Sequence, residues 1–263
     1  MKQQKWEEVL TVELKKAEKQ LSFALAVSCA PKQHPDAIHL ARTSIKTMRA
    51  AFRLLREAFP VGEYRVINQS LREAGQAISL LRDQEVLRKT VVKLTAKTRG
   101  SRSAEPTRPI SRRPISNALR KLKAIGGHFR CLPWASIDLH IVKEGLKRLY
   151  RQGKKAARLA HAKRSNRRLH TWRKRVKDLG YALFLSGFGE SVAEAQVLLL
   201  SEHLGEDHDL AVFQEKNHMR PDKKALDCLA WKDRYRHQKK AFRIGRCLFS
   251  ARAGQFIEHV KEC

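Results

Sequence analysis

Basic residues recur at helical spacing in two copies of one pattern, and this constrains the fold more than any other feature. One copy begins at His39 and the other at His170; an arginine follows three positions later and a lysine seven positions later. At 100° per residue such positions share one side of an α-helix, so the pattern predicts two helices with narrow cation rows. The rows comprise His39, Arg42, Lys46, Arg49 and Arg53, and His170, Arg173, Lys174, Lys177 and Tyr181. The first row would extend about 21 Å, which suits a linear polyanion better than a small metabolite.

The charge balance indicates a polyanionic partner. The 263 residues include 55 Lys and Arg against 26 acidic residues, a formal net charge of +29. The basic side chains repel one another unless bound anions offset their charge, which favours a polyanionic ligand. The simpler alternative is that they only form a solvated surface. The apolar fraction of 42% exceeds that of a disordered basic tail. The five scattered cysteines form no zinc or disulfide pattern, and no signal peptide or membrane span is apparent, so we expect a cytoplasmic protein.

Helical periodicity covers almost the whole chain, and no stretch alternates with period two. We expect helices over about 6–29, 34–59, 63–79, 80–97, 115–126, 136–161, 170–186, 191–204, 207–218 and 222–250, followed by a loosely ordered tail. Residues 98–114, rich in proline and serine, predict a linker. The predicted fold is all-α, with a first bundle over 1–97 and a second over 115–263.

The repeat extends beyond the histidines. After each basic helix an aspartate, Asp83 or Asp209, stands three residues before a valine. We expect both acids at helix starts, where a carboxylate caps backbone donors or pairs with a nearby base. A divalent-metal site at Asp83 and at Glu206–Asp209 is the alternative.

These segments resemble the CHAD family, the conserved histidine α-helical domain. The resemblance rests on IHLARTSIKTMRAAFRLL (38–55), LLRDQEVLRK (80–89), GLKRLYRQGKKAARLA (145–160), LHTWRKRVKDLGYAL (169–183) and LGEDHDLAVF (204–213). It implies two four-helix bundles with pseudo-two-fold symmetry. It also implies binding of inorganic polyphosphate in a basic groove between them, without catalysis. Thr47 and Gly180 depart from the family pattern, and Gly180 predicts a slightly less stable second helix.

Two further basic rows follow from the same helical arithmetic. One comprises Lys143, Lys147, Arg151, Lys154, Arg158 and His161, and the other Lys232, Arg236, Lys239, Arg243 and Arg246. A charged row is often only a solvated helix face. Like charges four residues apart destabilise a helix by about 0.2–0.5 kcal/mol per pair, so four such rows favour a polyanionic ligand.

We therefore predict a non-catalytic polyphosphate-binding protein, with association with polyphosphate granules as a further expectation. No catalytic residue, cofactor or metal is expected, because no carboxylate follows His39 or His170 at helical spacing and no nucleotide-binding loop appears. Nucleic acid is the rival ligand, but only 7% of residues are aromatic and no stacking platform is evident. A metal-dependent polyphosphate-processing enzyme is the second rival.

Overall fold

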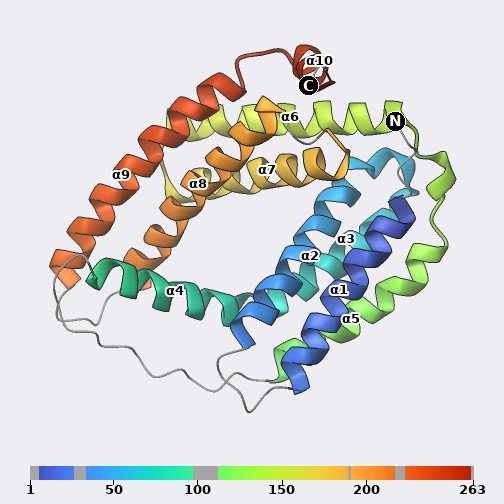
Figure 1. Cartoon of the computed structure of the whole chain (residues 1–263), viewed down its shortest axis with the longest axis horizontal. Coiled ribbons are helices and arrows are strands. Elements are labelled where there is room, and N and C mark those ends of the chain that lie inside the picture. Colours follow the sequence, from blue (N-terminus) through green and yellow to red (C-terminus); the bar gives the residue numbers. More distant parts are fainter. Residues whose placement is uncertain (1–5, 27–33, 97–111, 189–190, 217–222, 262–263) are drawn as a thin grey trace. The chain divides into compact units, whose positions relative to one another are not determined.

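The computed structural model describes residues 6–26, 34–96, 112–188, 191–216 and 223–261. Every regular element in these ranges is a helix, which confirms the predicted all-α fold. The elements in chain order are α1 (Trp6–Ala26), α2 (His34–Leu54), η1 (Arg56–Ala58), α3 (Val61–Ala77), α4 (Ser79–Thr95), α5 (Arg112–Arg130), η2 (Trp134–Ser136), α6 (Leu139–Ala162), α7 (Asn166–Leu185), α8 (Val192–Lys216), α9 (Lys223–Leu248) and α10 (Ala253–Lys261) (Figure 1).

Local sequence explains where several helices begin and end. Pro60 stands immediately before α3, where its fixed φ suits a helix start and its missing N–H costs nothing. The Ser165 hydroxyl accepts from the backbone N–H of Arg168 and so caps the start of α7. At the other end of α7, Gly187 adopts φ 70°, a left-handed conformation that glycine reaches without strain.

Two predicted helix ends and the predicted loose tail are wrong. α8 is one continuous helix through Gly205, where we expected a break, and α5 continues through Gly126 and Gly127. A helical glycine costs about 1 kcal/mol, and burial of the flanking apolar residues offsets this cost. The expected loose tail contains α10, whose Phe256 and Ile257 are buried.

The predicted linker is partly wrong as well. Its residues 98–111 lie outside the described ranges, but Arg112–Pro114 form the first turn of α5. Proline is tolerated in the first turn of a helix because no intrahelical hydrogen bond is lost there.

The first compact unit comprises Met1–Glu85 and Pro106–Gly145. Within it, α1 packs on α2 and α5, and α3 packs on the same two helices, so the four form a closed bundle (Figure 1). Phe52 anchors an aromatic cluster, with ring centroids 5.3 Å from Phe59 and 5.4 Å from Phe129. A Cβ at Gly145 would collide with the carbonyl oxygen of Leu54, so α6 begins in close contact with the end of α2.

The second unit comprises Val86–Glu105 and Leu146–Cys263. Within it, α8 packs on α7, α9 and α10. Trp172 of α7 stacks on Phe242 of α9 with ring centroids 5.3 Å apart. The Tyr150 hydroxyl of α6 lies 3.1 Å from the carbonyl oxygen of Leu248 and 3.0 Å from that of Ala251, and burial raises its pKa to about 12. α4 joins through a cluster of Leu94, Leu210, Phe213, Leu226 and Ala230.

The bounds of these units differ from those of the predicted bundles. α5 belongs to the first unit, because its apolar face packs on α1 and α3. The end of α4 from Val86 onward belongs to the second unit, where Leu94 is buried. Helical periodicity identifies an apolar face but not its packing partner, so the sequence alone could not place these bounds.

Candidate functional site

The first cation row lies along the flank of the buried face of α2. Burial of Ile38, Ile45 and Phe52 fixes the rotation of the helix. The rotation leaves His39 exposed and holds the rest of the row half-buried: Arg42, Lys46, Arg49 and Arg53. Arg42 Nη1 donates to the carbonyl oxygen of Gly75 on α3, at 2.8 Å. The row therefore lies at the rim of the core, and a hydrogen bond to α3 orients Arg42.

The second row lies on α7 and faces α8. The His170 ring lies 4.4 Å from the ring of His208, and α8 presents Gly205 to the Arg173 guanidinium. Arg173 and Lys177 are half-buried, whereas Lys174 is exposed. The half-buried Tyr181 completes the row, and burial raises the pKa of its phenol against a smaller opposing effect of Arg173.

Gly180, the departure from the family pattern, lies where α7 and α8 approach closely. A Cβ at this position would come within 3.0 Å of Val197 Cγ1. A side chain here would therefore require Val197 to move. Close packing thus accounts for the glycine.

The row on α6 divides into two parts. Lys143 and Lys147 are half-buried, whereas Arg151, Lys154 and Arg158 are exposed. The exposed part borders an open hollow of about 880 Å³, together with His161 on α6 and Arg246 of α9. Among the described residues that line the hollow, five are Lys or Arg and none is acidic.

Lys154 also has a structural role at this hollow. Its Nζ donates to the carbonyl oxygens of Ala251, at 2.9 Å, and Ser250, at 3.4 Å. These carbonyls follow the C-terminus of α9, where a cation offsets the partial negative charge of the helix end.

The row on α9 is mostly a solvated face. Lys232, Arg236, Lys239 and Arg243 are all exposed. Arg236 Nη1 lies 3.4 Å from Asp233 Oδ1, three residues earlier on the same helix.

The acidic residues lie within helices, and the prediction that they stand at helix starts is wrong. Asp83 is in the second turn of α4, and Asp207 and Asp209 are in the second half of α8. Ion pairing, the other part of the prediction, is observed: Arg82 Nη1 contacts Asp83 Oδ1 at 3.2 Å. The buried Asp207 binds Arg234 of α9. Across the described residues, no three His, Cys, Asp or Glu side chains group as a metal site.

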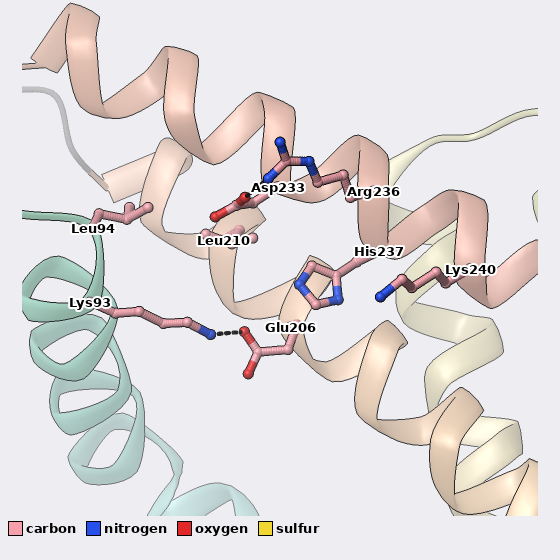
Figure 2. Close-up of a pocket in the computed structure, with 8 residues that line it drawn as sticks. All are labelled: Lys93, Leu94, Glu206, Leu210, Asp233, Arg236, His237 and Lys240. Carbon is pink, nitrogen blue, oxygen red and sulfur yellow. Dashed lines mark hydrogen bonds and ion pairs between the residues drawn. The ribbon is translucent and has the colours of Figure 1, made fainter. Parts of the chain in front are cut away.

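A second hollow, of about 230 Å³, lies where α4 meets α8 and α9 (Figure 2). Lys93 of α4 binds Glu206 of α8 there, with Nζ and Oε2 2.6 Å apart. Beside it, His203 Nδ1 lies 3.2 Å from His237 Nδ1, within hydrogen-bond distance. Burial lowers the pKa of both imidazoles.

Three features of the second unit were missed in the sequence. Lys93 and Arg234 were not recognised as ion-pair partners, because the acids they contact lie on another helix. The exposed aromatic pair of α9 was missed as well. Trp231 and Tyr235 stack on the surface of α9, with ring centroids 6.0 Å apart. Their spacing of four residues in one helix was the available signal.

The protein is therefore an all-α protein with basic rows on four separate helices, α2, α6, α7 and α9. The chain belongs to the CHAD domain family, whose model matches residues 15–218. Neither the curated proteins nor the solved structures contain a match to the chain. The described helices include none long and apolar enough to span a membrane.

Proposed function

We propose that the protein binds inorganic polyphosphate, without catalysis, through the cation rows of α2 and α7, with the rows of α6 and α9 adding charge. The observation that carries the proposal is the half-burial of matching cations in the two motifs: Arg42, Lys46, Arg49 and Arg53 on α2, and Arg173 and Lys177 on α7. The net charge of +29 also favours a polyanionic ligand, because such a ligand reduces the repulsion among the basic residues.

Half-burial favours phosphate binding for two reasons. Charge interactions strengthen where the local dielectric constant is lower than that of water. Arginine also presents a planar fork that matches two phosphate oxygens, and Arg42 is already oriented by its bond to Gly75. The α2 row, about 21 Å long, suits successive phosphates of one polymer. In this proposal the protein acts in the cytoplasm, at polyphosphate granules.

A polyphosphate-processing enzyme would need carboxylates that hold a metal near the phosphates. Asp83 and Asp207 instead contact arginines, and Glu206 contacts a lysine. These ion pairs support the non-catalytic alternative. Hydrolysis of polyphosphate with Mg²⁺ that disappeared in Asp83→Ala and Asp209→Ala variants would contradict it.

The decisive test is a titration with polyphosphates of graded length. We expect affinity per chain to rise with length in the wild type. In an Arg42→Ala/Arg173→Ala variant we expect affinity for long chains to fall at least about tenfold, because each charge-assisted hydrogen bond contributes about 1.5–3 kcal/mol.

The matched control is Arg65→Ala/Arg252→Ala. It removes the same charge from exposed positions, one in each unit and outside all four rows. We expect it to weaken binding less than about threefold, since only long-range charge is lost. Equal losses in the two double variants would remove the motif helices from the site.

A further inference from the structure

Two large aromatic side chains lie exposed on the outer face of α9. Trp231 is 62% exposed and Tyr235 is 53% exposed, and their planes differ by only 15°. In the core an aromatic side chain would bury about 150–250 Å². α9 packs into the second unit through other residues, including the fully buried Leu226 and Ala230. The stacked pair therefore serves no packing role in the core.

Cations flank this aromatic pair along the same helix. Lys239 continues the row of Trp231 and Tyr235 at the same four-residue interval, and Lys232 and Arg236 form the adjacent row. All three basic side chains are exposed. Arg236 also contacts Asp233, the acid drawn beside it in Figure 2.

Flat aromatic rings beside cations match a ligand that carries both flat rings and phosphates. In single-stranded nucleic acid the bases can stack on the rings while the backbone contacts Lys and Arg. Inorganic polyphosphate has no apolar part that would use the rings. A duplex keeps its bases stacked inside and would use only the cations.

We propose that the exposed face of α9, centred on Trp231 and Tyr235, is a binding site for single-stranded nucleic acid. The site is additional to the polyphosphate-binding rows of α2 and α7 and does not depend on them. It includes Arg236 and Lys239, two residues of the basic row on α9 that the sequence predicted to bind polyphosphate. The cations contact the phosphates of the nucleic acid, and base stacking on the two rings adds affinity beyond that of the charges.

The test is fluorescence anisotropy with a labelled oligothymidylate of about 12 nucleotides and the full chain. Because stacking contributes about 1–3 kcal/mol per base, we expect Trp231→Ala/Tyr235→Ala to weaken binding at least about tenfold. Trp231→Phe/Tyr235→Phe should retain most of the affinity, since flat rings remain. Both side chains are exposed, so the fold should be preserved, and far-UV circular dichroism checks this.

Phe23→Ala/Phe184→Ala is the matched control, because it removes two exposed aromatic rings, 43% and 67% exposed, from other helices. We expect it to bind the oligonucleotide as the wild type does. Equal binding by the control and the Trp231→Ala/Tyr235→Ala variant would overturn the proposal. The proposal would also be overturned if Trp231→Ala/Tyr235→Ala kept its oligonucleotide affinity but lost binding to phosphatidylserine vesicles. The two rings would then bind a lipid surface.

The two proposed ligands separate by reciprocal variants. Trp231→Ala/Tyr235→Ala should leave long-chain polyphosphate affinity within about twofold of wild type, whereas Arg42→Ala/Arg173→Ala should reduce polyphosphate binding more than oligonucleotide binding. If the ring variant lost both ligands in equal proportion, the α9 site would not be selective for bases and the inference would fail. If Arg42→Ala/Arg173→Ala bound polyphosphate as the wild type does, the proposed function would be contradicted. The α9 site for single-stranded nucleic acid would be unaffected by that result.

Discussion

Arg234 of α9 binds Asp207 of α8 inside the second unit, with Nε and Oδ1 3.0 Å apart. The side chains are only 14% and 3% exposed. Gln238 donates to the same Asp207 oxygen at 2.8 Å, and the other guanidinium nitrogens reach Gln214 and Asn166. This network joins α7, α8 and α9 and gives Asp207 a structural role within α8 rather than at a helix start.

We expect Asp207→Ala to lower the free energy of unfolding by about 3–5 kcal/mol, because it leaves a largely buried guanidinium without its carboxylate. Urea unfolding followed by circular dichroism measures the change. Glu63→Ala is the control, since Glu63 and its partner His128 are 39% and 42% exposed and such a surface pair contributes at most about 1 kcal/mol. Similar losses in both variants would show that Asp207 has no special structural role.

Two glycine substitutions should have opposite effects. In Gly145→Ala the new methyl group would collide with the backbone carbonyl of Leu54, which cannot move aside cheaply, so we expect a loss of about 1–3 kcal/mol. In Gly127→Ala nothing lies within 4 Å of the new Cβ, and α5 should gain up to about 1 kcal/mol from helix propensity. Thermal unfolding of both variants tests the close approach of α6 to α2. A stabilised Gly145→Ala protein would contradict it.

The His203–His237 contact predicts a pH dependence of stability. Burial lowers the pKa of both imidazoles in the folded protein, so the unfolded chain binds more protons as pH falls below about 6.5. Stability should therefore be fully present above that pH and decline as pH falls toward the folded pKa values. Lys93, Lys240 and Arg243 add positive charge, and Glu202, Glu206 and Asp233 oppose it.

His237→Asn should flatten this dependence, because one of the two titrating groups is removed. The measurement is the difference in Tm between pH 7.5 and 5.5 for the variant and the wild type. His259→Asn, at an exposed position of α10, is the control and should behave as the wild type does. An unchanged pH dependence in His237→Asn would exclude the pair as its source.

Salt should weaken polyphosphate binding in proportion to the number of cations engaged. A plot of log affinity against log salt concentration is expected to be linear, by the counterion release known for nucleic acids. Arg49→Ala should make the slope less steep by about 1, since one phosphate contact is lost. The exposed Arg65→Ala variant should leave the slope nearly unchanged. Equal slopes for Arg49→Ala and the wild type would place Arg49 outside the site.

The helical fold class and the cation rows could be predicted from the sequence alone. Both follow from residue spacing, because 3.6 residues per turn place His39, Arg42, Lys46 and Arg49 on one side of a helix whatever it packs against. The same arithmetic does not predict which helices pack together. It could not show that α8 continues through Gly205, since the burial that stabilises this helix comes from α7 and α9.

Packing between helices determines which charged side chains lie at the edge of the core and which are solvated. Half-burial of Arg42 and Arg173 depends on packing against α3 and α8, whereas Arg236 and Lys239, equally basic in sequence, lie in solvent. Tertiary packing also paired Asp207 with Arg234 and left Trp231 and Tyr235 outside the core. Helical spacing fixes which side chains share a face, and the neighbouring helices fix what that face meets.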